Sequence, residues 1–135
     1  MTNKAERRYQ LFTRLERAGF SYHEAEALRR IEMRLSRWGE HECNGTIQRD
    51  EETDLPYWYG GAYGDTRLGR AADREKGALK RLAAIMADHP DYVAHHQSDP
   101  RGCALYIVAR HDLEDGARDL PVDEYYTRGI AVCAS

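Results

Sequence analysis

The chain has 135 residues, 41% of them hydrophobic and 32% charged, which predicts one soluble domain. No apolar run approaches the length of about 20 residues that a membrane-spanning helix needs, so we expect no such segment. Its net charge of −3 excludes a global basic field, so we expect no nucleic-acid partner, although positive charge can still be concentrated locally. The odd set of cysteines, Cys43, Cys103 and Cys133, predicts free thiols in a reducing cytosol. The first residues lack the apolar stretch of a signal segment.

The N-terminal part of the chain predicts a helix over residues 4–18. Apolar residues recur there at helical spacing, and Gly19 is a natural stop. We expect residues 1–20 to form a helical extension of a single domain that covers residues 1–135.

Ser21 opens a second predicted helix, because Glu24 three residues later completes a capping box. Its apolar stripe consists of Leu28, Ile31, Leu35 and Trp38. Such a stripe suits either a helix from a second subunit or the chain's own sheet, and the short repeat favours the sheet. The helix should end at Gly39 or at Asn44-Gly45.

A hairpin is predicted from Thr46–Arg49 and Leu55–Tyr59, joined by the charged turn Asp50–Asp54. Pro56 favours a place at the sheet edge. Residues 60–65 hold three glycines and predict a mobile flap.

A third helix is predicted from Asp73 to Ala87, with Asp73 as its N-cap. Its apolar face is formed by Leu79, Leu82, Ile85 and Met86. Gly77 would lie inside this helix, where glycine costs about 1 kcal/mol relative to alanine, so it indicates close packing or ligand approach.

The centre of the fold is predicted to be a hairpin formed by residues 92–97 and 103–108. The turn Asp99-Pro100-Arg101-Gly102 joins its strands, and a last strand over residues 128–133 should pair with residues 105–108. Strands joined by short turns predict an α+β fold, with an antiparallel sheet, helices packed on one face, and an extra N-terminal helix or helical hairpin.

No catalytic signature is present, so we expect no catalytic residues, no metal and no cofactor. The pairs His41/Cys43 and His95/His96 lack metal-ligand spacing, because neighbouring residues on a strand point to opposite faces. Asp50-Glu51-Glu52 is typical of a solvated turn rather than of an acid pair.

Arginines close to aromatic residues and glycines are the strongest functional signal. Guanidinium groups bind phosphate through two parallel hydrogen bonds, and an aromatic face can stack a base. This favours a phosphorylated nucleotide, whereas surface salt bridges and tyrosines packed at the sheet edge are an equally open interpretation. The arginines are Arg74, Arg101, Arg110 and Arg128, and the nearby tyrosines are Tyr92, Tyr106, Tyr125 and Tyr126.

Several segments resemble small proteins encoded by bacteriophages and prophages. The resemblance covers residues 26–133 and rests on LRRIE at 28–32, CNG at 43–45, QRDEET at 48–53, DREKGAL at 73–79, DPRGCALY at 99–106 and YTRGI at 126–130. The chain also resembles the Thoeris anti-defence proteins, which bind and hide a cyclic ADP-ribose isomer without cleaving it and assemble as dimers or higher oligomers. His95-His96 and the N-terminal helix do not fit that pattern.

This resemblance implies a phage-type anti-defence protein in the cytoplasm of a bacterial host, with a homo-oligomer as its assembly. It implies that Arg74, Arg101, Arg110 and Arg128 hold the pyrophosphate. Tyr92 would stack adenine and Gln97 would read its edge. The ligand would be a cyclic ADP-ribose isomer or, as the other candidate, a cyclic oligonucleotide.

Two other functions remain open. The first is a protein-binding inhibitor of a host defence complex, similar to an anti-CRISPR protein, in which the acidic turn Asp50–Asp54 mimics nucleic-acid phosphates. The second is a hydrolase of the same nucleotide, which is the least favoured because no nucleophile, base and metal can be named.

Overall fold

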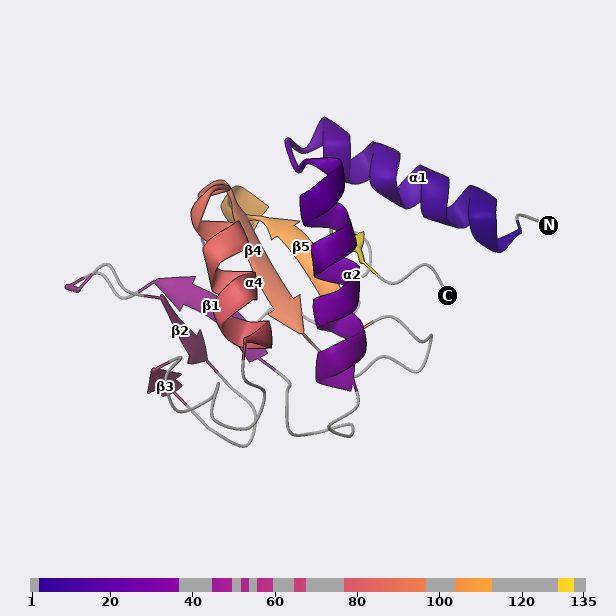
Figure 1. Cartoon of the computed structure of the whole chain (residues 1–135). Coiled ribbons are helices and arrows are strands. Elements are labelled where there is room, and N and C mark those ends of the chain that lie inside the picture. Colours follow the sequence, from indigo (N-terminus) through magenta and orange to yellow (C-terminus); the bar gives the residue numbers. More distant parts are fainter. Residues whose placement is uncertain are drawn as a thin grey trace.

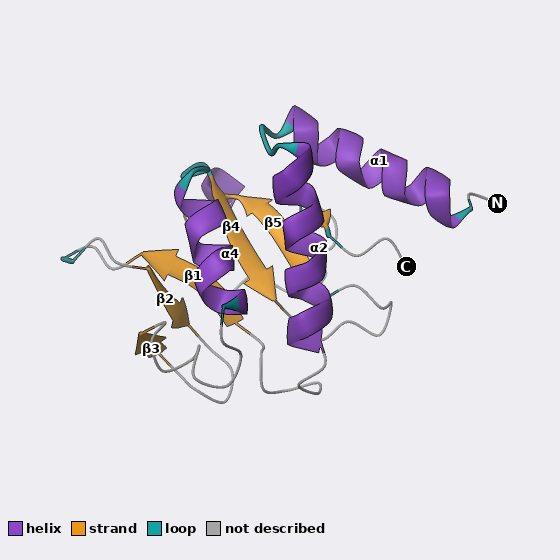
Figure 2. Cartoon of the chain, in the orientation of Figure 1, coloured by secondary structure: helices purple, strands orange, loops and turns teal. Residues whose placement is uncertain are grey.

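The computed structural model describes residues 3–36, 45–49, 52–53, 56–59, 65–67, 77–96, 104–112 and 129–132. A six-stranded antiparallel sheet has the strand order β3-β2-β1-β4-β5-β6. Helices α2 and α4 lie over one face of it, which confirms the α+β fold (Figure 1; Figure 2). The helices are α1 (Lys4–Arg17), α2 (Tyr22–Ser36) and α4 (Ala78–Ala87). The strands are β1 (Gly45–Arg49), β2 (Pro56–Tyr59), β3 (Asp65–Arg67), β4 (Tyr92–His96), β5 (Leu105–Ala109) and β6 (Ile130–Ala131).

Helix α1 begins and ends as its sequence predicts. The side chain of Asn3 caps it by accepting the Glu6 N–H at 2.8 Å. At its other end Gly19 has φ of 98°, and the Phe20 N–H bonds the Leu15 carbonyl at 3.0 Å. This Schellman arrangement reverses the chain and places Phe20 and Leu15 in the core. The last half of α1 is therefore part of the domain core.

Helix α2 is joined to the core by its apolar stripe. The predicted capping box is confirmed, because Ser21 N donates to Glu24 Oε1 at 2.9 Å and Glu24 N donates to Ser21 Oγ at 3.1 Å. Leu28, Ile31 and Leu35 are buried in one cluster with residues of α4 and the sheet. The stripe thus packs within the chain. Trp38, Gly39 and the predicted stop at Asn44 lie outside the described residues.

The hairpin of β4 and β5 lies inside the sheet, as predicted. Tyr92 pairs with Ala109 at one end of the ladder, and His96 pairs with Leu105 at the other. Strand β6 pairs with β5 through Tyr106 and Ile107, which confirms the predicted last strand. The β5 strand is buried from Leu105 to Val108 because neighbours flank it on both sides.

The β1–β2 hairpin is confirmed, but its predicted place at the edge is wrong. Asp65–Arg67 forms β3, which pairs outside β2 through Tyr57 to Tyr59. Pro56 is tolerated because it is the first residue of β2, and the β3 register does not extend to it. The predicted flap therefore overlaps a strand at Asp65, and the rest of it lies outside the described residues.

Helix α4, which corresponds to the predicted third helix, begins later than predicted. Gly77 has φ of 91° and precedes α4 as its N-cap, so it lies before Ala78 and not inside the helix. The positive φ explains why glycine stands there. The predicted apolar face is buried as expected, whereas Asp73 lies outside the described residues. The three cysteines also lie outside the described residues.

None of the helices in the described part of the chain has the length and apolar character needed to cross a membrane.

Candidate functional site

Two of the six predicted ligand-binding residues are described, and they lie at the same end of the β4–β5 hairpin. Tyr92 begins β4 opposite Ala109, and Arg110 follows β5 directly. Arg74, Gln97, Arg101 and Arg128 lie outside the described residues. Their meeting with Arg110 in one cleft stays a prediction.

Arg110 is held by the turn that links α4 to β4. Its backbone N–H donates to the Asp91 carbonyl at 2.7 Å, and its side-chain Nε donates to the Pro90 carbonyl at 2.8 Å. The side chain is exposed, and among the described residues no carboxylate forms an ion pair with it. The terminal N–H groups of the guanidinium can therefore donate to a ligand. Asp88 and Asp91 lie exposed on the same turn and would weaken that site for an anion.

Tyr92 is more enclosed than a free stacking platform. Its ring is half-buried against the core cluster and meets Phe20 edge-on, with centroids 5.7 Å apart. Its backbone N–H donates to the His89 carbonyl at 3.0 Å. A base could therefore contact only the part of the ring that the core leaves accessible.

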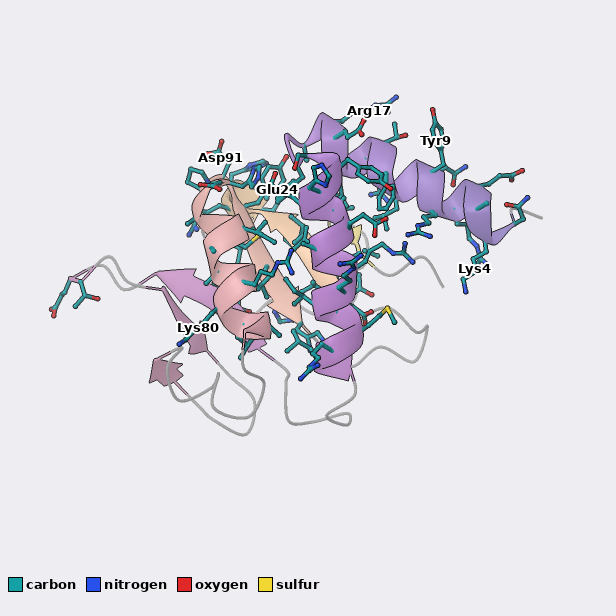
Figure 3. The ribbon with its side chains drawn as sticks, viewed as in Figure 1. Lys4, Tyr9, Arg17, Glu24, Lys80 and Asp91 are labelled. Atoms are coloured by element: carbon teal, nitrogen blue, oxygen red, sulfur yellow. The ribbon has the colours of Figure 1, made fainter. Side chains whose placement is uncertain are left out.

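His89 and Glu24 join α2 to the same turn, a contact that the sequence analysis missed. Nε2 of His89 lies 2.9 Å from Oε2 of Glu24, and the two side chains are only 12% and 23% exposed. The His89 ring also stacks on Phe20 at a centroid distance of 3.8 Å. The capping box had identified Glu24, but no local pattern links it to a residue 65 positions away. Figure 3 shows Glu24 and Asp91 at this end of the molecule.

The carboxylate of Glu24 is stabilised in its charged form. Partial burial by itself raises the pKa of Glu24, but the hydrogen bond from the Ser21 backbone and those from the His89 ring and the Ser21 hydroxyl lower it below its ordinary value of 4.5. One carboxylate thus caps α2 and also binds the α4–β4 turn that holds Arg110.

A second polar cluster lies on the other face of the sheet. Thr46 pairs with His95 across β1 and β4, and Thr46 Oγ1 lies 2.6 Å from His95 Nδ1. Tyr106 is the next residue in this row, opposite His95 on β5. Side chains alternate along a strand, so this row faces away from Ala94 and Ile107, which pack under the helices. Thr46 and Tyr106 are 8% and 3% exposed, so this cluster is enclosed.

Within the described ranges, no group of three or more His, Cys, Asp or Glu side chains is placed to hold a metal ion. No protein-family model, curated protein or solved structure matches the chain.

Proposed function

We propose that the protein binds a cyclic nucleotide immune signal, a cyclic ADP-ribose isomer, and sequesters it without cleaving it, as a phage-type anti-defence protein. The observation that carries the proposal is the exposed guanidinium of Arg110. The Pro90 carbonyl holds its Nε, and no described carboxylate neutralises it. A cation held in this way presents its remaining donors to a phosphate at little entropic cost.

A pyrophosphate carries more charge than one guanidinium can match, so the proposal includes Arg74, Arg101 and Arg128 as further donors. Tyr92 and Gln97 would contact the base. Asp88 and Asp91 repel an anion near the α4–β4 turn, which makes these additional cations necessary. The proposed assembly is a dimer or higher oligomer, which light scattering after size exclusion would detect.

Binding without turnover is part of the proposal. Among the described residues, the pair closest to a nucleophile and its base is Thr46 with His95. Thr46 is 8% exposed, so a nucleotide held at Arg110 would not reach its hydroxyl group. This burial supports capture of an intact ligand.

Calorimetry with a cyclic ADP-ribose isomer and with cyclic oligonucleotides tests the proposal. Arg110→Ala should weaken binding by roughly 10- to 100-fold, the range for losing charge-assisted hydrogen bonds of about 1.5–3 kcal/mol. Arg81→Ala is the matched control, because Arg81 is an exposed arginine on α4. The ligand released by heating should be intact by mass spectrometry. Absence of heat with both ligand classes, or a cleaved product, would contradict the proposal.

A protein-binding inhibitor is the second candidate, and the turn between β1 and β2 favours it. Glu52 and Thr53 are exposed in this turn, which projects from the end of the sheet (Figure 1). An acidic projection can mimic the phosphates of a nucleic acid. A stoichiometric host protein in a pull-down, lost with Glu52→Lys, would favour this candidate.

A further inference from the structure

The N-terminal half of α1 projects from the domain. Every residue from Asn3 to Gln10 is exposed, whereas Leu11 and Leu15 farther along the same helix are buried. Figure 1 shows this half extending beyond α2, away from the sheet. The domain core therefore supports only the last turns of α1, and the first turns present their side chains to solvent on all sides.

Charge is segregated onto this helix. Helix α1 carries five basic and two acidic residues, a net charge of +3. The whole chain has a net charge of −3, so the residues outside α1 together carry −6. The net charge of the whole chain therefore does not show that α1 is basic and that the remaining residues, the acidic body, carry net negative charge.

One face of α1 forms a stripe of three arginines and one glutamine. Arg7, Gln10, Arg14 and Arg17 follow each other at spacings of three and four, so they share one side of the helix. All four are exposed, and no described side chain forms an ion pair or hydrogen bond with them. Surface arginines are usually balanced by nearby carboxylates. Glu16 lies on another side of this helix, and Glu6, four residues before Gln10, is the one acidic residue of α1 beside the stripe.

The side of α1 that faces the core becomes basic where the core ends. One helical row contains Leu15, Leu11, Arg8 and Lys4. Figure 3 shows Lys4 and Tyr9 on opposite sides of the projecting half. An apolar partner surface would require apolar residues in place of Arg8 and Lys4. The projecting half is suited to face negative charge.

Arginines from both helices also converge near Phe12. The guanidinium carbons of Arg8 and Arg29 lie 5.6 and 5.9 Å from the centre of its ring. Arg8 pairs with Glu26 at 2.8 Å, and no described carboxylate pairs with Arg29. Positive charge therefore also lies on the side of α1 that faces α2, opposite the stripe.

We propose that α1 is a nucleic-acid contact that binds phosphodiester groups through Arg7, Arg14 and Arg17. A membrane surface fits less well, because an interfacial helix needs a broad apolar face, and the exposed surface of α1 is mainly charged and polar. Tyr9 is 74% exposed and Tyr22 is 53% exposed, so each offers a ring for base stacking. This site is separate from Arg110 and does not depend on the function proposed above.

The length of α1 limits the expected contact to a few base pairs. A helix of 14 residues is about 21 Å long, which corresponds to roughly six base pairs. The residues outside α1 together carry negative charge and repel phosphates, so we expect only α1 to lie on the nucleic-acid backbone. We expect weak, sequence-independent binding in the range of about 10⁻⁶ to 10⁻⁴ M, with strong dependence on salt.

Fluorescence anisotropy of the full chain tests this with labelled DNA of about 20 nucleotides, single-stranded and duplex, from about 50 to 200 mM salt. Arg7→Ala/Arg14→Ala removes two charges and keeps good helix formers. Its affinity should fall at least about tenfold, and its salt slope on duplex should decrease by about 1.8. Lys80→Ala/Arg81→Ala removes two exposed charges from α4 and should stay within about twofold of wild type.

Binding to either form of DNA, with the loss confined to the α1 variant, supports the proposal. Equal losses in both double variants would overturn it, because binding would then reflect net charge. Absence of binding at the lowest salt would also overturn it. A poly-glutamate peptide that competes as well as the oligonucleotide would overturn it too and would identify an acidic protein as the partner of α1.

Discussion

Helices α1 and α2 have 14 and 15 residues, both are rich in arginine, and a short polar side chain caps each of them. They nevertheless have opposite environments. Helix α2 buries Ala25, Ala27, Leu28, Ile31 and Leu35, whereas α1 buries only Leu11 and Leu15. The apolar row of α2 continues along the helix, and that of α1 ends where Arg8 and Lys4 replace it. The extent of the apolar row, and not helix propensity, decides how much of each helix the domain covers.

Truncation in the core of α2 should give the largest effect. Leu28 is fully buried, so Leu28→Ala should lower the free energy of unfolding by about 2–5 kcal/mol through lost transfer energy and a residual cavity. Tyr9→Ala on the projecting half of α1 should change it by less than about 0.5 kcal/mol. Urea denaturation measures both. Similar losses for the two variants would show that the first half of α1 is also packed in solution.

The contact between Glu24 and His89 should give an intermediate effect that depends on pH. The pKa of Glu24 is lowered in the folded protein. Below about pH 4.5 the unfolded state therefore binds more protons, and the free energy of unfolding decreases as the pH is lowered. The contribution is complete at neutral pH and is lost as the pH passes downward through the folded pKa. Glu24→Gln should remove about 1 kcal/mol at neutral pH and flatten the acid limb of the stability curve.

Thermal unfolding at a series of pH values measures this, with Glu16→Gln as the control. Glu16 is exposed on α1, and its side chain has no hydrogen-bond partner among the described residues, so its variant should follow the wild-type curve. A wild-type acid limb in Glu24→Gln would contradict the assigned role of the carboxylate.

Local patterns predicted the elements that local physics determines. The Ser21–Glu24 capping box, the Gly19 stop and the turn before Leu105 each depend on residues close in sequence, and the structure confirms the elements they delimit. Strand β3 was missed because three polar residues show no strand pattern, and it exists through pairing with β2. Gly77 was placed inside a helix because composition does not reveal a φ of 91°.

The contacts at the candidate site are harder to predict from local sequence patterns than the helices and strands are. Tyr92 and Arg110 were proposed from residue type, and their common place follows from the strand register. The carbonyl of Pro90 that holds Arg110, and the His89–Glu24 contact beside it, depend on the approach of distant segments. Net charge is also a coarse guide, because a total of −3 does not show that α1 carries +3 and the remaining residues −6.

The two helix caps should separate local from global stability, and the cap of α1 should give the smallest effect. Ser21→Ala should lower the free energy of unfolding by about 1 kcal/mol, because α2 cannot fray without exposing the core. Asn3→Ala removes an equivalent hydrogen bond to Glu6, but the turns that it caps have no buried residue. Its cost should therefore appear as faster amide exchange at Glu6 and Arg7, with global unfolding in urea unchanged within about 0.3 kcal/mol.

A loss of global stability in Asn3→Ala as large as that in Ser21→Ala would mean that the first turns of α1 are held by a surface in solution. Adding the oligonucleotide would then extend the comparison. Phosphates bound along Arg7 and Arg14 should slow amide exchange in the first turns of α1 and leave α2 unaffected, because ligand binding stabilises the segment that it contacts. Protection of α2 alone would place the nucleic acid elsewhere.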